Sequence, residues 1–221
     1  MTSTTTGSIR HGIRDLAWLS LLGLSALTGC GSLLPKPQPQ PALFVLDDTT
    51  VAGAVTPASP VLSSAVSTLV VNEPRAASGY NTREIVYVRA ANQLEAFAFN
   101  QWVEPPAVML GPLLVHAIER TGAFRAVVRA PTSVAGDVRL DTELIRLQQE
   151  FTVVPSRVRL TLRAVLIDTA TRRVIASREF DAEVASPSDD PAGGVATANQ
   201  VAHRVLAEVA AFCAQWIVKP K

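Results

Sequence analysis

Cys30 is the residue whose position indicates chemistry most clearly, and it ends the run Leu27-Thr28-Gly29-Cys30. Two basic residues, Arg10 and Arg14, precede an apolar stretch of 12 residues from Leu16 to Leu27. This order of charge, apolar core and small residues is typical of a secretory signal. A helix that spans a bilayer needs roughly 20 residues, so the apolar stretch is too short to remain as an anchor.

These features predict a signal peptide over residues 1–29 that is cleaved between Gly29 and Cys30. Cleavage leaves the cysteine at the new amino terminus. The run resembles the lipobox of bacterial lipoproteins, and this resemblance implies that the Cys30 sulfur carries a diacylglycerol and that its amine carries a further acyl chain. One acyl chain holds a protein at a bilayer only marginally, whereas two or more hold it stably. The alternative is a buried core cysteine behind an apolar leader.

Residues 30–41 are predicted to form the lipidated cysteine and a tether, because every second residue from Pro35 to Pro41 is proline. Alternating prolines favour an extended polyproline II segment of about 3.1 Å per residue. Such a tether would lift the following domain, residues 42–221, on the order of 30 Å off the lipid surface. In lipoproteins of this class an aspartate after the cysteine commonly marks retention in the inner membrane. Gly31 therefore favours the outer membrane, with the domain facing the periplasm.

Other side chains that could do chemistry are few and scattered. His116 and His203 each lie alone on a predicted helix, with no second ligand three or four residues away, so no zinc site is predicted. Asp47 and Asp48 could form a metal pair, but aspartate readily bonds its own backbone in turns, and we interpret them as turn residues. Cys213 lies in an apolar helical stretch, where a thiol is most often a small buried hydrophobe.

Familiar catalytic motifs do not occur in the sequence. It has no glycine-rich phosphate loop, no nucleophile elbow and no Cys-x-x-Cys motif. Serines are plentiful, but none has a neighbouring base that would activate it. We therefore expect a protein that is not an enzyme and that has no metal and no cofactor.

Three arginines, Arg157, Arg159 and Arg163, lie on one face of a predicted strand. Acidic residues alternate with apolar ones in the strands before and after it, residues 138–144 and 174–184. The arginines could form a strip that binds phospholipid headgroups or docks a partner. They could also be the centre of a charge ladder on a solvated sheet face, where opposite charges across strands contribute roughly 0.2 to 1 kcal/mol a pair. The flanking acids favour the ladder, because they neutralise the arginines locally.

The elements that must position these residues can be read from hydrophobic periodicity. The three alternating strands predict an antiparallel sheet with one apolar and one charged face. Shorter apolar runs predict five more strands. These runs are residues 42–46, 68–72, 84–89, 94–99 and 123–128.

Two helices are predicted. The first opens at Glu104-Pro105-Pro106 and ends near Gly122, and Gly111-Pro112 marks either its true start or a kink. The second has Asp190 as N-cap and Pro191 as first helical residue, and its apolar stripe covers residues 195–218. The fold class is therefore α+β: an antiparallel β-sheet with two main helices packed on one face, preceded by the signal peptide and the tether.

Composition excludes one class of partner. Loss of Arg10, Arg14 and Asp15 with the leader takes the chain from 20 basic and 19 acidic residues to a net charge of zero. A nucleic-acid-binding domain needs a clear basic excess, so no nucleic acid partner is expected. The chain is 48% hydrophobic and 18% charged, which is apolar for a soluble domain and hints at surfaces covered by something else.

The sequence as a whole resembles the ABC-type transport auxiliary lipoprotein family, to which the paraquat-inducible protein C lipoproteins belong. The resemblance covers roughly residues 42–216. It depends on the lipobox and tether followed by a series of matching segments. These are Tyr80, the run Arg83–Arg89, the run Leu94–Trp102, Pro105-Pro106 and Gly122-Ala123-Phe124.

The resemblance implies an accessory subunit that works with an MCE-domain (mammalian cell entry) protein and with the ABC permease and ATPase of the same system to move lipids between the inner and outer membranes. The membrane would be reached through the lipid anchor, phospholipid is a candidate contact, and assembly into a homo-oligomer is compatible with it. One alternative is a structural envelope lipoprotein that chaperones or plugs an outer-membrane β-barrel. The other is a periplasmic enzyme whose site is assembled from scattered residues.

Overall fold

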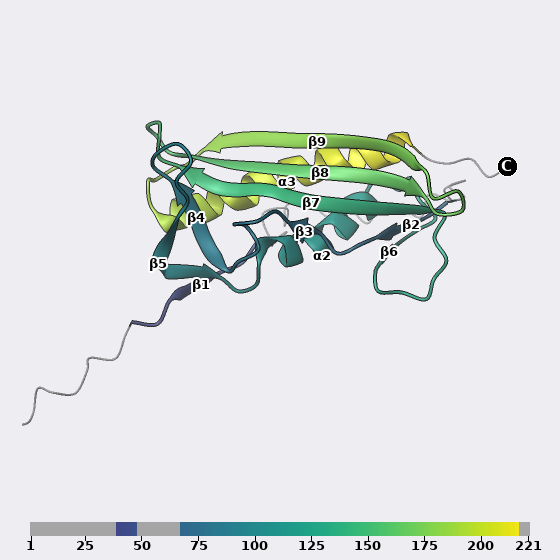
Figure 1. The fold of residues 1–221 in the computed structure, drawn as a ribbon, viewed down its shortest axis with the longest axis horizontal. Helices are drawn as coiled ribbons and strands as arrows, with labels where there is room; N and C mark the ends of the chain where they lie inside the picture. Colours follow the sequence, from purple (N-terminus) through teal and green to yellow (C-terminus); the bar gives the residue numbers. More distant parts are fainter. Residues whose placement is uncertain (1–38, 48–66, 217–221) are drawn as a thin grey trace, which may run out of the picture. The chain divides into compact units, whose positions relative to one another are not determined.

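The computed structural model describes residues 39–47 and 67–216, so the predicted signal peptide, Cys30 and most of the tether lie outside the described residues. The elements below belong to one unit that begins at Gln40. In chain order they are β1 (Ala42–Phe44), β2 (Thr68–Val71), β3 (Arg75–Ala76), β4 (Glu84–Val88), β5 (Glu95–Trp102), α2 (Pro106–Glu119), β6 (Ala126–Arg129), β7 (Val138–Glu150), β8 (Arg157–Asp168), β9 (Val174–Ala185) and α3 (Pro191–Gln215) (Figure 1).

The three long strands β7, β8 and β9 form the predicted antiparallel meander. Val138 pairs with Asp168 and Glu150 with Arg157, so β7 and β8 pair along their whole length. The register shifts between Leu144 and Arg146. Such a bulge places two residues opposite one and changes which residues face the core. This is why the strict apolar and polar alternation of β7 breaks at this point.

The prediction of an antiparallel sheet is wrong for the rest of the molecule. Within the described residues, nine strands form one mixed sheet. On the side away from β8, strand β7 pairs in turn with β2, β3 and β4, and all three pairings are parallel. The pairs β2–β6 and β1–β5 are parallel as well, while β4 and β5 form an antiparallel hairpin. Periodicity reports which face of a strand is buried, but it does not report which strand is its neighbour.

Helix α2 begins at Pro106 and continues through Pro112. The sequence left open a later start at Gly111-Pro112, and the structure places both residues inside the helix. The helix ends at Glu119, and Gly122 follows with a φ of 62°, a left-handed conformation in which glycine carries no Cβ penalty.

Helix α3 begins as the sequence predicts. Pro191 is its first residue, and the Asp190 carboxylate accepts a hydrogen bond of 2.7 Å from the backbone N–H of Gly193. The helix ends at Gln215 and its C-cap is Trp216. Its early turns lie close to β7: an added Cβ at Gly194 would overlap the Gln149 Oε1 atom.

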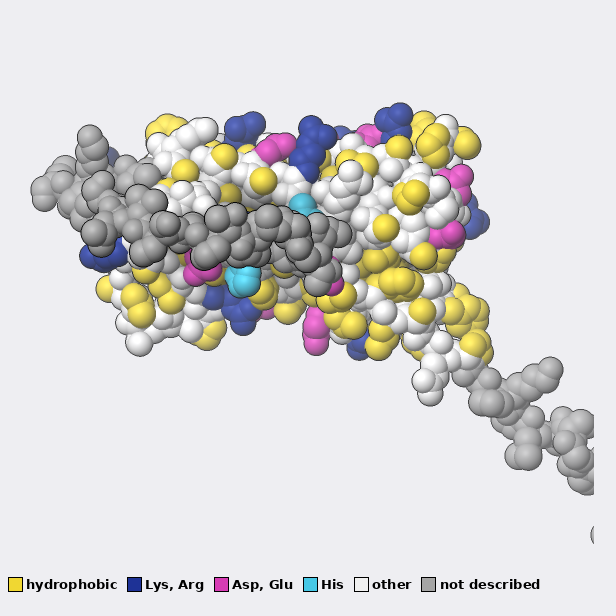
Figure 2. Space-filling view, turned by 180° about the vertical axis from the view of Figure 1, so that it is seen from behind, with side chains coloured by type: hydrophobic (Ala, Val, Ile, Leu, Met, Phe, Trp, Pro, Cys, Tyr) yellow, Lys and Arg dark blue, Asp and Glu magenta, His cyan; other side chains and the backbone are white. Residues whose placement is uncertain are grey.

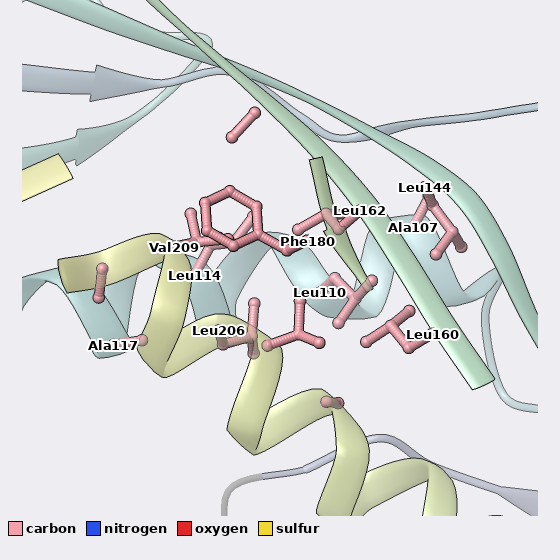
Figure 3. Close-up of a cluster of buried hydrophobic side chains, with 14 of the residues drawn as sticks. Ala107, Leu110, Leu114, Ala117, Leu144, Leu160, Leu162, Phe180, Leu206 and Val209 are labelled. Atoms are coloured by element: carbon pink, nitrogen blue, oxygen red, sulfur yellow. The ribbon is translucent and has the colours of Figure 1, made fainter. Parts of the chain in front are cut away.

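Both helices in the described part pack on the apolar face of the sheet and on each other (Figure 3). Leu110 and Leu114 of α2 are fully buried, as are Leu160 and Leu162 of β8. Burial of each such side chain stabilises the fold by roughly 1.5–3 kcal/mol. Between the sheet and α3, the Phe180 ring meets the Phe212 ring at a centroid distance of 5.6 Å.

Two tryptophans differ in burial. Trp102 is 2% exposed and belongs to the core, whereas Trp216 is 45% exposed. Cys213 is fully buried among core residues, and this burial raises the pKa of its thiol to about 12. A thiol with that pKa stays protonated at neutral pH and behaves as a small hydrophobe. In the part of the chain that the structure describes, no helix is long and apolar enough to cross a membrane.

Candidate functional site

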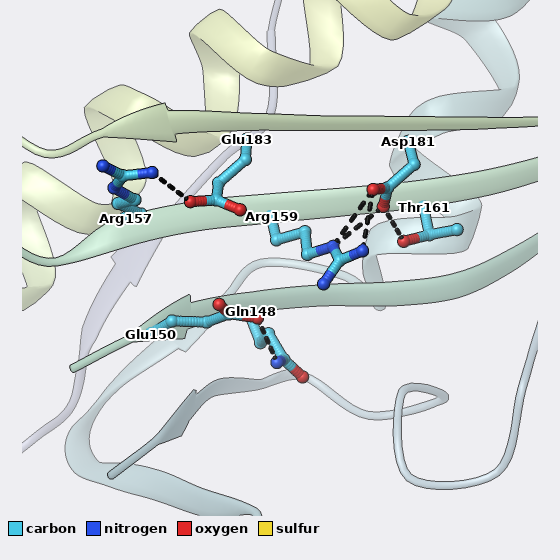
Figure 4. A network of polar contacts seen from close by, with 7 residues as sticks. All are labelled: Gln148, Glu150, Arg157, Arg159, Thr161, Asp181 and Glu183. Carbon is cyan, nitrogen blue, oxygen red and sulfur yellow. Dashed lines mark hydrogen bonds and ion pairs between the residues drawn. The ribbon is translucent and has the colours of Figure 1, made fainter. Parts of the chain in front are cut away.

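The face of β7, β8 and β9 that is turned away from the helices carries a ladder of ion pairs (Figure 4). Arg159 forms a two-pronged pair with Asp181, with Nε to Oδ1 at 2.9 Å and Nη2 to Oδ2 at 2.8 Å. The Arg157 Nη1 atom lies 2.7 Å from Glu183 Oε1. The three predicted arginines therefore do lie on one face. We call Arg157, Arg159, Arg163 and their acidic partners the charged face.

Arg163 bridges all three strands. Its Nη1 atom lies 3.1 Å from Glu143 on β7, and its Nη2 atom lies 3.1 Å from Glu179 on β9. These residues are directly opposite it in the strand register. Arg157 and Arg159, in contrast, reach diagonally past their direct neighbours on β9. Side chains as long as arginine can span such diagonal positions.

Electrostatics tighten the Arg159–Asp181 pair. The hydrogen bond from Arg159 is the main cause that holds the pKa of the Asp181 carboxyl below its ordinary value, and the Thr161 hydroxyl donates a further bond to the same carboxylate. The Asp181 carboxylate raises the pKa of Arg159 in return. The side chains of Arg159 and Asp181 are 35% and 39% exposed, so water screens the pair and its net contribution to stability is small.

The side chains of Gln148 and Glu150 continue the charged face toward the turn between β7 and β8. Gln148 donates from Nε2 to Glu150 Oε1 at 2.8 Å, and the Tyr80 hydroxyl donates to Gln148 Oε1. Burial raises the pKa of Tyr80. The phenol therefore stays protonated at neutral pH and can act as the donor in this bond.

A polar groove lies where β2 gives way to β3. Val71 pairs with Leu140 and Arg75 with Glu143, so three residues of the β2–β3 segment lie opposite two residues of β7. One of the three is Pro74, which has no N–H to donate to the ladder. Two adjoining pockets of about 210 and 250 Å³ occupy this irregularity. Their lining residues are Asn72, Glu73, Arg75, Asp141, Thr142, Glu143, Arg163 and Val165.

The groove mixes charges of both signs, and one of its lining residues, Thr142, belongs to the buried row of β7. Thr142 is 5% exposed, and its Oγ1 atom has no hydrogen-bond partner among the described residues. Asn72 donates from Nδ2 to Asp141 Oδ1 at 2.6 Å. These groups can hold a polar ligand, but the lining contains no histidine, lysine or cysteine that would make a nucleophile of the hydroxyl. The sequence analysis did not predict the groove. The feature that could have indicated it is Pro74, which follows a short apolar strand.

The remaining candidates stay apart from this face. His116 is on α2 and His203 on α3, and the residues that the structure describes contain no cluster of three or more potential metal ligands. Gly29 and Cys30 lie outside the described residues. An apolar pocket beside the start of α3, lined by Trp102, Gln149 and Gly194 among others, has a volume of about 10 Å³, which is room for about one water molecule and not for an acyl chain.

Comparison with known proteins decides the family. Residues 44–210 match the ABC-type transport auxiliary lipoprotein component family. The chain belongs to this family. It is therefore an auxiliary, lipid-anchored component of ABC-type transport systems, a non-catalytic kind of protein that associates with such a system. The prediction made from the sequence resemblance is confirmed at this level.

Solved structures of other proteins share the fold. Protein XCC0632 from Xanthomonas campestris is 24% identical, with a TM-score of 0.64 over 80% of this chain and 94% of that chain. The structure of an uncharacterized protein is 16% identical, with a TM-score of 0.58 over 81% of this chain and 99% of that chain. No curated protein matches this chain. At these identities the likeness concerns the fold alone.

Proposed function

We propose that this auxiliary lipoprotein is anchored through acylated Cys30 in the outer membrane and docks an MCE-domain protein whose ABC permease and ATPase move lipid between the membranes. The observation that carries the proposal is the family match over residues 44–210. The sequence has no phosphate-binding loop of its own, so the energy for transport comes from the partner ATPase. The signal peptide over residues 1–29 and the tether over residues 30–41 belong to the same proposal.

Docking is favoured over direct carriage of lipid by the packing of the interior. The core residues between the sheet and the two helices are almost completely buried, and the apolar pocket beside α3 holds about 10 Å³. A lipid acyl chain requires a far larger apolar cavity, since ligand pockets are typically about 300–1,000 Å³. The domain is accordingly proposed as a rigid adaptor.

We propose the charged face as the docking surface. Each arginine of the strip already has a carboxylate partner at 2.7 to 3.1 Å, so a phosphate group would have to displace that carboxylate to bind. A protein surface with the reverse pattern of charges can instead add to the existing pairs. Complementary charge patterns give orientation and partner selectivity more than raw affinity, which suits an adaptor.

The proposal is tested by crosslinking in intact envelopes followed by purification of the auxiliary lipoprotein. We expect an MCE-domain protein and ABC components to be recovered with it. Arg159→Ala should lower their recovery several-fold, whereas Arg204→Ala should not, because Arg204 forms an exposed pair with Glu208 on α3, away from the charged face. Recovery of a β-barrel protein without any ABC component would favour the chaperone or plug alternative and would overturn the proposal.

A further inference from the structure

Two hairpin turns and the first strand lie at one end of the long strands. Strands β4 and β7 run parallel, with Val88 opposite Glu150, so the turns that follow them, residues 89–94 and 151–156, leave the sheet side by side. Figure 1 places both turns at the same end of β7 and β8 as the start of β1. We call these two turns the turn pair.

The turn pair exposes aliphatic side chains to solvent. Val154 is 89% exposed, Leu94 is 48% exposed and Val153 is 44% exposed. Close to β1 the surface is also apolar, because Leu43 and Phe99 are each 55% exposed. Figure 2 shows hydrophobic side chains gathered around the part of the surface where β1 lies. Large side chains such as these are seldom left in water without a partner when they cluster.

An aromatic cluster joins the two turns beneath these side chains. The Tyr87 ring lies 4.5 Å from the Phe97 ring and 5.7 Å from the Phe151 ring, measured between centroids. The backbone N–H of Phe151 donates to the Val88 carbonyl at 2.8 Å. The Arg89 guanidinium covers the outer side of the Tyr87 ring at 4.9 Å. The two turns are thus held as one rigid surface and not as two independent loops.

The charges around the turn pair do not sum to a basic excess. Arg89 pairs with Glu95 at 3.9 Å. Arg157, the first residue after the β7–β8 turn, pairs with Glu183. In the following segment Asp189 accepts a hydrogen bond from the backbone N–H of Ser156. This end therefore has no basic excess that would attract an anionic surface, and its contact with a partner must be mainly apolar.

The length of chain before β1 limits what can cover this surface. Eleven residues lie between Cys30 and Ala42, and a fully extended chain of that length spans at most about 40 Å. Because the chain enters the domain at β1, at the same end of the long strands as the turn pair, this is the end of the domain whose greatest possible distance from residue 30 is shortest. We propose that Val153, Val154 and Leu94 insert into the interface of the bilayer that holds the acyl chains, which gives the domain a second membrane contact and a fixed orientation. This inference rests on the proposed acylation of Cys30, and it requires the tether to run along the lipid surface and not to hold the domain about 30 Å above it.

The test uses the full-length acylated protein in neutral phosphatidylcholine vesicles that contain nitroxide-labelled phosphatidylcholine as quencher. An environment-sensitive fluorophore is attached at Val154→Cys and, as control, at Ala170→Cys in the β8–β9 turn, which lies at the opposite end of β8. Cys213 stays unlabelled because it is fully buried and its thiol pKa is about 12. We expect the label at position 154 to be quenched severalfold more strongly than the label at position 170. Phosphatidylglycerol or added salt should change the quenching by less than about twofold, because the contact is apolar.

A matched pair of substitutions checks the side chains themselves. With the fluorophore at Leu94→Cys, Val154→Asp should lower the quenching severalfold, because it places a charge at the tip of the turn pair. Val174→Asp should leave the quenching unchanged, since Val174 is an equally aliphatic side chain, 61% exposed, at the opposite end of the sheet.

The outcomes separate this inference from the function proposed above. Protein that floats with the vesicles but shows no stronger quenching at position 154 than at position 170 would overturn the membrane contact and leave the anchor intact. A blue-shifted emission without quenching would also overturn it, because a second copy or another protein would then cover the turn pair. Protein that fails to float would overturn the anchor at Cys30 and, with it, the membrane contact.

Discussion

Strand β8 has one face that is buried and one face that is exposed to solvent. Leu160 and Leu162 point toward the helices and are almost completely buried, whereas Arg159 and Arg163 point away and stay about one-third to one-half exposed. The same backbone holds both sets. The buried face should therefore account for most of the folding free energy. Substitutions on the charged face should cost little stability, so its residues can vary to match a partner protein.

The largest effect should follow from a change on the buried face. Leu162→Ala removes a side chain that is 0% exposed in the centre of the core, and a cavity of this kind costs about 2–5 kcal/mol. We expect a clear fall in the urea midpoint of unfolding. The adjacent Arg163→Ala is the control, and it should cost about 1 kcal/mol or less. Similar losses of stability for the two variants would contradict the conclusion that the buried face supplies most of the folding free energy.

A smaller effect of opposite sign should come from the hydroxyl in the buried row of β7. Thr142 lies between Leu140 and Leu144, and its Oγ1 atom has no hydrogen-bond partner among the described residues. Because an unsatisfied buried hydroxyl costs roughly 1–3 kcal/mol, Thr142→Val should raise the free energy of unfolding by about 1 kcal/mol.

Thr161→Val is the matched comparison for that variant. The Thr161 hydroxyl donates to Asp181, so the same substitution should lower the free energy of unfolding by about 1 kcal/mol. If Thr142→Val also lowers the free energy of unfolding, a ligand or ordered water satisfies the Thr142 hydroxyl.

How far the sequence could predict these faces depends on how local the signal is. The alternation in residues 157–166 predicted both faces of β8 and the acidic partners of its arginines. The cap at Asp190 with Pro191 was equally local and is confirmed. The parallel pairing of β7 with β2, β3 and β4 was not predictable from such patterns, because strand neighbours are chosen by tertiary packing. The groove at Pro74 depends on that pairing and was missed with it.

A double-mutant cycle measures the coupling free energy of the Arg159–Asp181 pair on the charged face. Arg159→Ala, Asp181→Ala and the double variant should give a coupling free energy of about 0.2–1 kcal/mol in low salt. The pair is bidentate at 2.8 and 2.9 Å, which favours the upper part of that range. Added salt should reduce the coupling, since the partners are more than one-third exposed and are screened. A salt-independent coupling would indicate that the pair is shielded from water by a partner or a second copy.

The smallest effect is a pH dependence that belongs to the charged face alone. The hydrogen bond from Arg159 lowers the pKa of Asp181 in the folded protein, so ionised Asp181 stabilises the fold above the ordinary aspartate pKa, and this stabilisation is lost as the pH falls through the lower folded value. Asp181→Asn removes the ionisation. The difference in free energy of unfolding between the wild-type protein and this variant should therefore be constant near neutral pH and shrink below about pH 4. Leu162→Ala should show a difference from wild type that does not change with pH, because no titrating group is removed from the buried face. A difference for Asp181→Asn that stays constant down to about pH 2 would mean that the carboxylate gains nothing from Arg159, and the charged face would then be a set of independent solvated side chains rather than a ladder.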